Sequence, residues 1–276
     1  RLPSGGTIHV EEVQDQVELA LMRTGEQKVA RAYVIYREQR AEARKATHAH
    51  HHPTLQILGQ NGQLTPLDLN ELTTTIATAA EGLEGIDVQA IVDETVKNLY
   101  NGVKATDIST TMMMATRTRI EQEPNYTYVT ARLLRDNLVA TGLEFLGLAS
   151  NTAEGDALET FLKKGIELDL LSPELLNFDL VKLAAAIKPE RSNQFTYLGL
   201  QTLFDRYFIH SDGVRFELPQ LFFMRVSMGL SLNEQNREER AIEFYNLLSS
   251  FDYMASTPTL FNSGTLRPQL SSCYLT

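Results

Sequence analysis

The sequence predicts a mainly α-helical protein, and two observations support this fold class. Apolar residues recur at spacings of three and four along most of the 276 residues, the period that places side chains on one face of a helix. Stretches that favour β structure are confined to a turn-containing segment near residue 60 and to residues 269–276. The length is sufficient for two or three domains of ordinary size.

Residues 7–45 are predicted to form two helices separated by the break TGEQ. A stripe of apolar residues defines the first helix, and Val29, Tyr33 and Tyr36 lie on one side of the second. The stripe consists of Val10, Val13, Val17 and Leu21.

A histidine-rich stretch follows these helices. Imidazole binds metal ions, so the stretch could chelate one, but no carboxylate or thiol lies close in sequence to complete a site. We therefore interpret it as a solvated linker. Its histidines are His48, His50, His51 and His52.

Residues 54–67 are predicted to form a β-hairpin, because two short apolar runs flank Gly59-Gln60-Asn61-Gly62 and Asn-Gly is a strong tight-turn signal. Asp68 is suited to cap the next helix. We expect the methionines at 112–114 to pack in a core. Apolar periodicity predicts helices over 69–83, 87–100, 105–122 and 125–147.

Helical patterns continue beyond residue 152 and then stop. Residues 256–264, STPTLFNSG, are typical of a loop, and residues 269–276, QLSSCYLT, have the composition of a strand. A first strand without a partner would leave its backbone groups unpaired, so we expect this sequence to be the front part of a longer chain. The helices are expected over 155–171, 177–187, 193–209, 216–232 and 237–255.

Charge and cysteine content exclude several classes of protein. The chain has 25 basic and 35 acidic residues, a net charge of −10, which argues against non-specific nucleic-acid binding. Its single cysteine, Cys273, excludes an intrachain disulfide and a four-cysteine zinc site. No apolar run reaches the length of a membrane span, and the N-terminal residues lack the apolar region of a signal peptide. We therefore expect a cytoplasmic protein that binds neither nucleic acid nor membrane.

Two motifs are similar to the large, catalytic subunit of class I ribonucleotide reductase. They are NQFTYLGLQTLFDRYFI and STPTLFNSGTLRPQLSSCYL. The hairpin, its capped helix and the next three helices resemble an ATP-cone, a nucleotide-binding regulatory domain, and residues 7–45 repeat the second half of that pattern. The resemblance implies the C-terminal half of a first cone at 1–45, a second cone at 46–148, and at 149–276 the helical start and first strand of a ten-stranded α/β barrel.

The resemblance also implies an activity, the reduction of ribonucleotides to deoxyribonucleotides. In that family a thiyl radical abstracts a ribose hydrogen, and a pair of cysteines supplies two electrons by becoming a disulfide. Cys273 matches the first cysteine of the pair, and Thr257 and Ser272 match residues that contact substrate. The second cysteine, the radical cysteine and the radical-relay tyrosines are missing from this sequence, so turnover requires further polypeptide.

The expected partners and cofactors come from the same resemblance. They are ATP and dATP as allosteric effectors with Mg²⁺, a small subunit whose metal site supplies the radical, and a thioredoxin- or glutaredoxin-type reductant. Self-association into dimers or higher oligomers is expected as well. No metal is expected on this chain.

The second cone departs from its family at the positions that grip phosphate. Functional cones carry two basic residues in the hairpin, where this chain has Gln60 and Asn61, and charge-assisted contacts are the strong ones for phosphate. Glu71 replaces a lysine, while Ala105 and Ser109 replace a hydroxyl and a histidine. We interpret this cone as degenerate. The alternative is a substitute site formed by Lys104, Arg117 or Arg119.

The first cone is then the expected activity switch. Its surviving half keeps His9, Arg37 and Arg40, and the resemblance implies that one of the arginines contacts the nucleotide. Two other functions compete with the reductase: a non-catalytic nucleotide-sensing or assembly protein built on ATP-cones, and a helical interaction protein. The second of these leaves the motif that contains Cys273 unexplained.

Overall fold

The computed structural model describes residues 17, 20–21, 29, 33, 55–59 and 62–273. Contacts between α-carbons divide the chain into a unit at residues 1–55 and a second at 56–276. In the first unit the five described residues before Leu55 are all helical and fall within the two predicted helices. The histidine stretch and the TGEQ break lie outside the described residues.

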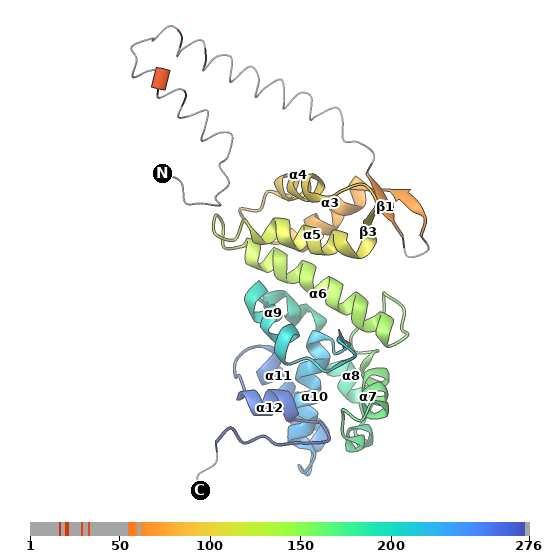
Figure 1. Ribbon diagram of the computed structural model, residues 1–276. Helices are drawn as coiled ribbons and strands as arrows, with labels where there is room; N and C mark the ends of the chain where they lie inside the picture. The colour runs from red at the N-terminus through yellow and green to blue at the C-terminus, as the bar shows by residue number, and fades with distance from the viewer. Residues whose placement is uncertain are drawn as a thin grey trace. The chain divides into compact units, whose positions relative to one another are not determined.

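The second unit begins with a small three-stranded sheet (Figure 1). Strands β1 (Gln56–Leu58) and β2 (Leu64–Pro66) form the predicted antiparallel hairpin, with Gly62 at a φ of 72° in its turn. A third strand, β3 (Val103–Lys104), pairs in parallel with β1, so the order is β2-β1-β3. The sequence does not predict β3, because a two-residue strand between helices carries no periodicity of its own.

Four helices follow in this part of the chain, and they begin close to the predicted residues. Asp68 caps the first, because its carboxylate accepts hydrogen bonds from the amides of Asn70 and Glu71 at 2.8 and 3.2 Å. Of the methionine run, Met112 is buried, Met113 is half-buried and Met114 is exposed, so core packing is confirmed only in part. The helices are α3 (Leu69–Ala80), α4 (Val88–Asn98), α5 (Ala105–Arg117) and α6 (Tyr126–Phe145).

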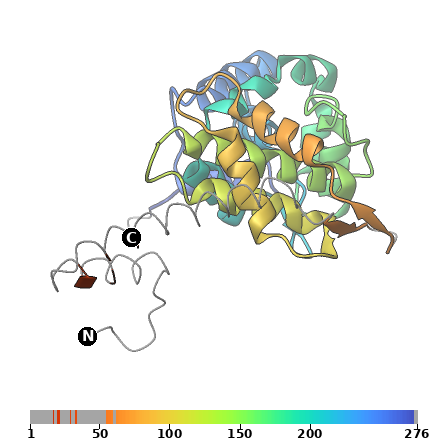
Figure 2. The same ribbon diagram turned by 90° about the horizontal axis from the view of Figure 1, so that it is seen from above.

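Helix α6 belongs to two hydrophobic cores. Val129 and Leu133 pack with α3, α4 and α5 in one core, and Leu138 and Leu143 pack in a larger core with the helices that follow. In Figure 1 α6 lies between the two groups, and Figure 2 shows α3 to α5 toward the viewer when the unit is seen from above. The predicted boundary at residue 148 therefore follows a helix that both cores share, and it stays a prediction.

The larger core is helical, as the sequence predicts. It also contains a two-stranded hairpin that the sequence does not predict, with Asp212 and Gly213 at positive φ, the pair typical of a tight turn. The helices are α7 (Leu158–Glu167), η1 (Pro173–Asn177), α8 (Leu180–Ala186), η2 (Pro189–Gln194), α9 (Tyr197–Arg206), α10 (Pro219–Ser231), α11 (Arg237–Ser249) and α12 (Thr257–Asn262), and the strands are β4 (His210–Ser211) and β5 (Val214–Arg215).

Helix α10 is the centre of the larger core, and its residues from 219 to 228 are all buried. The run FELPQLFFMRVSMGLSL predicts this buried character. Gly229 lets the turn at residues 263–264 approach the helix, because an added Cβ would lie 2.1 Å from the amide nitrogen of Gly264. The turn after α12 is therefore pressed against α10.

One prediction near the end of the chain is wrong, and another is not confirmed. Residues 257–262 form helix α12 and not a loop, because Pro258 fits the first turn of a helix, where no amide donor is needed. Residues 269–273, the described part of the predicted strand 269–276, are not assigned to a strand, and none of the described strands pairs with them. The expected first barrel strand is thus not observed up to Cys273.

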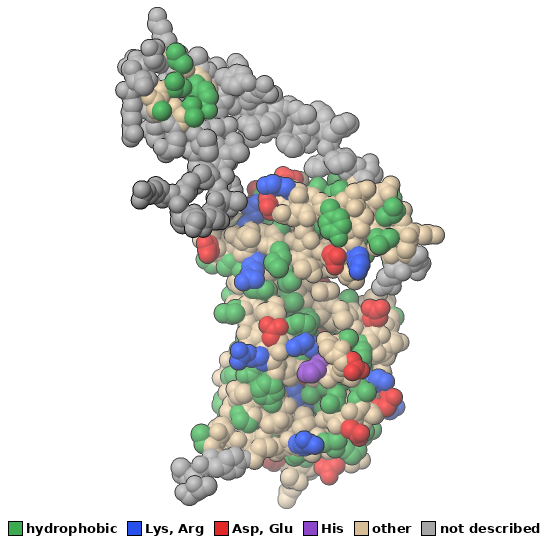
Figure 3. All heavy atoms as spheres, viewed as in Figure 1, with side chains coloured by type: hydrophobic (Ala, Val, Ile, Leu, Met, Phe, Trp, Pro, Cys, Tyr) green, Lys and Arg blue, Asp and Glu red, His purple; other side chains and the backbone are tan. Residues whose placement is uncertain are grey.

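The described surface shows no sign of a membrane or metal-binding segment. Figure 3 shows acidic and basic side chains interspersed on the visible face. None of the described helices is long and apolar enough to cross a membrane. Within the described residues, no group of three histidine, cysteine or acidic side chains could hold a metal ion.

Candidate functional site

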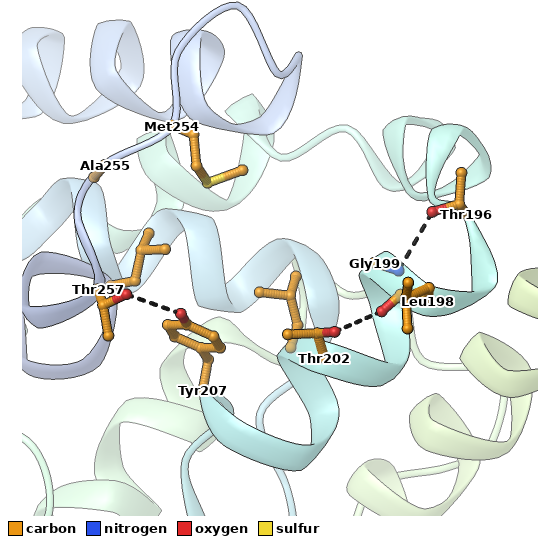
Figure 4. Close-up of a pocket in the computed structure, with 10 residues that line it drawn as sticks. Thr196, Leu198, Gly199, Thr202, Tyr207, Met254, Ala255 and Thr257 are labelled. Carbon is orange, nitrogen blue, oxygen red and sulfur yellow. Dashed lines mark hydrogen bonds between the residues drawn. The ribbon is translucent and has the colours of Figure 1, made fainter.

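Thr257, a predicted substrate-contacting residue, is the first residue of α12 and is exposed. Its hydroxyl lies 3.1 Å from the hydroxyl of Tyr207, the residue that follows α9 (Figure 4). The Tyr207 ring also stacks on Phe261, one turn along α12, with the ring centroids 4.6 Å apart. Thr257 is therefore held by a residue 50 positions earlier in the chain.

A hollow of about 530 Å³ opens beside this pair. It lies between the start of α9, the segment before α12, and α12 itself, and its polar groups are mostly hydroxyls (Figure 4). Short hydroxyl side chains donate and accept hydrogen bonds, which suits the oxygens of a phosphate or a sugar. Its lining residues are Thr196, Leu198, Gly199, Thr202, Leu203, Tyr207, Met254, Ala255, Thr257 and Leu260.

Helix α12 also holds the segment that leads to Cys273. The side-chain amide of Asn262 donates to the carbonyl of Gln269 at 2.7 Å, and the hydroxyl of Thr259 donates to the carbonyl of Leu270 at 3.5 Å. Sequence reasoning misses both residues, because it predicts a loop for their motif. Only on a helix do positions three apart lie on one side.

Cys273 and Ser272, the other predicted site residues of this region, are exposed. The cysteine is a free thiol, and its Sγ lies 4.0 Å from the Ser272 hydroxyl. Ser271 donates from its hydroxyl to the carbonyl of Cys273 at 3.0 Å. The contacts of Asn262 with Gln269 and of Thr259 with Leu270 tie the segment before Cys273 to α12, whose first residue is Thr257.

A buried ion pair fixes the C-terminal end of α12. Arg225 and Glu217 have no exposed side-chain surface, and their charged groups meet through two hydrogen bonds of 2.6 and 3.2 Å. Arg225 also donates to the carbonyls of Ser263 at 2.7 Å and Leu260 at 3.3 Å. The guanidinium thus satisfies carbonyls that the end of a helix leaves unpaired.

Glu154, which precedes α7 in the chain, is a second buried carboxylate and contacts the start of α10. It accepts a hydrogen bond from the amide of Gln220 at 2.8 Å. Burial raises its pKa to about 7, since the charged form loses its hydration, while the Gln220 amide and the charge of Arg135 act in the opposite direction. The side chain of Gln220 links in turn to Ser192 and Tyr245 at 2.8 and 2.7 Å.

A smaller hollow of about 310 Å³ lies at the hairpin turn of the predicted second cone. Lys104 is the basic residue among those that line it, and the start of α5 forms another wall. Gln60 and Asn61 lie outside the described residues. Glu71, Ala105 and Ser109 are described, with Glu71 and Ala105 exposed and Ser109 half-buried. The lining residues are Leu58, Gly59, Gly62, Lys104, Ala105 and Thr106.

The three candidate basic residues of the alternative nucleotide site, Lys104, Arg117 and Arg119, have different surroundings. Arg117 is at the far end of α5 from Lys104, roughly 20 Å away at 1.5 Å per residue, and its guanidinium lies over the Tyr197 ring at 5.4 Å. Arg119 donates to the carbonyl of Ala90 at 3.1 Å. Of the three, only Lys104 borders the hairpin hollow.

The predicted residues of the first cone, His9, Arg37 and Arg40, lie outside the described residues. Residues 1–42 match the family model of the ATP cone domain, and residues 193–268 match that of the ribonucleotide reductase all-alpha domain. The second match includes Tyr207, Thr257, Arg225 and Asn262. It ends before Ser272 and Cys273.

Curated ribonucleoside-diphosphate reductase subunits are similar to this chain over most of its length. The ribonucleoside-diphosphate reductase subunit alpha of Chlamydia muridarum is 40% identical over 97% of the chain, and that of Helicobacter pylori is 34% identical over 80%. The large subunit from Caenorhabditis elegans is 29% identical over 79%. The chain spans only 27–28% of the length of these relatives. The chain thus belongs, over the quarter of their length that it represents, to the family of ribonucleoside-diphosphate reductase alpha subunits, with an ATP-cone domain and a ribonucleotide reductase all-alpha domain.

Proposed function

We propose that this chain is the N-terminal part of a ribonucleoside-diphosphate reductase alpha subunit that reduces ribonucleotides to deoxyribonucleotides. The observation that carries the proposal is the 40% identity over 97% of the chain to a subunit of that name. The all-alpha domain match at 193–268 supports it independently. In this proposal α12 and the segment after it present Thr257, Ser272 and Cys273 to the substrate.

The reduction requires two thiols. Carbon 2′ of the ribose loses its hydroxyl as water and gains a hydrogen, while two thiols lose two electrons and two protons and become a disulfide. Cys273 is proposed as one of these thiols. The second thiol, the radical cysteine and the remaining barrel would come from further polypeptide of the same subunit, and the radical from a small subunit with a metal site. A thioredoxin- or glutaredoxin-type protein would then reduce the disulfide.

Activity of the complete gene product tests this proposal. The product would be assayed with its small subunit for formation of deoxynucleotides, alongside the variants Cys273→Ser and Tyr253→Phe. We expect Cys273→Ser to lose turnover with dithiol reductants. Tyr253→Phe should keep full turnover, because Tyr253 is an exposed residue outside the proposed site. Retained multiple turnover in Cys273→Ser would contradict the role of Cys273. An inactive complete protein that still binds ATP would favour the non-catalytic nucleotide sensor.

We also propose that ATP and dATP, with Mg²⁺, regulate the protein through the first cone and that the second cone binds neither. The cone match at residues 1–42 supports the first part. The separation of Lys104, Arg117 and Arg119 supports the second, because a triphosphate needs several converging donors.

Calorimetric titration of the complete protein with dATP separates the two cones. The variant Arg37→Ala/Arg40→Ala is expected to lose micromolar dATP binding, whereas Lys104→Ala is expected to keep it. If binding survives the arginine variant and is lost on adding Lys104→Ala, the second cone holds a substitute site and the degenerate assignment is wrong.

A further inference from the structure

We infer that Tyr207 is a positioning residue that sets the direction in which the Thr257 hydroxyl donates its proton to substrate. This inference rests on the proposed function, in which Thr257 contacts an oxygen of the nucleotide. Nothing in the sequence motif assigns a role to the Tyr207 hydroxyl. The argument starts from the 3.1 Å contact between the two hydroxyls.

The Tyr207 side chain is held on two sides. Its ring stacks on Phe261 at 4.6 Å and 22°, and it meets Phe222 edge-on at 6.5 Å. Phe222 is fully buried in α10. The phenol therefore has little freedom to turn, and its hydroxyl stays near Thr257 whether or not a ligand is present.

The number of protons that the two hydroxyls can donate then decides which of them is the donor when an anion binds. Each hydroxyl has one proton to donate, and a phosphate oxygen only accepts. If Thr257 donates to a phosphate, it has no proton left for Tyr207. Tyr207 must then be the donor and the Thr257 oxygen the acceptor. The pair becomes a chain of two hydrogen bonds from phenol to threonine to ligand, and such chains strengthen each other.

The position of the pair fits this role. Thr257 is exposed and Tyr207 is half-buried, and both line the hollow of about 530 Å³. Thr257 is also the first residue of α12, whose other end is anchored by Arg225. Without a partner, the Thr257 hydroxyl could rotate about its C–O bond even on a rigid backbone, and its proton would have no fixed direction. The hydrogen bond from Tyr207 removes that freedom. Preorganised donors bind more tightly because less ordering is needed on binding.

The test is a double-mutant cycle on the complete protein with CDP as the probe at a fixed ATP concentration. The variants are Tyr207→Phe, which keeps the ring stack, Thr257→Val, which keeps the shape, and their combination. Equilibrium dialysis gives the Kd of CDP for each. Tyr253→Phe is the matched control, since its exposed hydroxyl makes no hydrogen bond within the described residues.

We expect Tyr207→Phe to raise the Kd roughly 2- to 10-fold, the range of a single hydrogen bond, and to leave the Kd unchanged in the Thr257→Val background. Tyr253→Phe should not alter the Kd. An equal effect of Tyr207→Phe in both backgrounds, or no effect in either, overturns the inference, as does a change in melting temperature without a change in Kd. A wild-type protein that does not bind CDP overturns the proposed function instead, and this inference with it.

Discussion

At the scale of single residues, Glu154 is a carboxylate in surroundings very unlike water. It is buried, it accepts one backbone hydrogen bond from Gln220, and it makes no ion pair within the described residues. Its pKa is raised to about 7 mainly by burial. A carboxyl with a raised pKa holds its proton in the folded protein at pH values where the unfolded chain has released it.

The free energy of unfolding should therefore fall as the pH rises from about 5 to about 8. The folded state binds more protons than the unfolded state between the ordinary pKa of a glutamate and about 7, so stability is greatest below this window and is lost through it. The difference is on the order of 3 kcal/mol for this group. Urea denaturation of the wild type and Glu154→Gln at pH 5 and pH 8 measures it.

Glutamine is the matched replacement, because it keeps the oxygen that accepts from Gln220 and removes the titration. Other groups titrate equally in both proteins. We expect Glu154→Gln to gain stability relative to the wild type as the pH rises. A constant difference between the two proteins across this range would contradict the raised pKa.

At the scale of elements, α12 depends on its anchor to α10. The ion pair of Arg225 and Glu217 is fully buried, and Arg225 also holds two carbonyls at the end of α12. The six residues of α12 are too few to be stable alone. Its geometry therefore comes from tertiary contacts.

Arg225→Met should destabilise the protein by about 3–5 kcal/mol, because it leaves Glu217 buried without its partner. Adding Glu217→Leu should recover part of this loss, since the unpaired carboxylate is then removed from this site. Guanidinium denaturation of the two variants and the wild type checks this. A double variant no more stable than Arg225→Met would contradict the prediction, because it would show that the unpaired charge of Glu217 is not what destabilises the single variant.

The sequence predicts the elements that carry their own signals. The helices from α3 to α11 have apolar periodicity, and the hairpin has Asn-Gly. Prediction from the sequence fails where an element depends on residues far away in the chain. Strand β3 exists because β1 is beside it, and α12 exists because Arg225 caps it. Thr257 and Cys273 are predicted as site residues through a resemblance, whereas Tyr207 is not, since its contact with Thr257 spans 50 residues.

At the scale of the whole molecule, α6 joins two cores. Leu133 is 4% exposed and packs in the core of α3 to α5, and Leu143 is fully buried in the larger core. One 20-residue helix thus contributes apolar surface to both. Loss of the helix would open both cores.

Leu133→Ala and Leu143→Ala should each cost about 2–5 kcal/mol, and each should lower the same unfolding transition of residues 56–273. Hydrogen exchange gives the readout, because the amides of α4 and α10 should lose protection together in both variants. Glu144→Ala, an exposed change on the same helix, should alter stability by less than about 0.5 kcal/mol. Loss of protection in α4 alone for Leu133→Ala would mean that the cores unfold separately.

The shared helix also limits how this protein can be recombined with others. A domain is portable when its hydrophobic interior closes within its own sequence, and here the interior around α3 to α5 also includes residues of α6. A chimera that replaces residues 56–125 alone would present a foreign surface to Tyr126, Val129 and Leu133. A successful exchange must include α6 of the donor protein. The residues of the recipient's larger core that contact α6 must then be changed to fit it. The same restriction should apply when this region is exchanged between proteins during evolution.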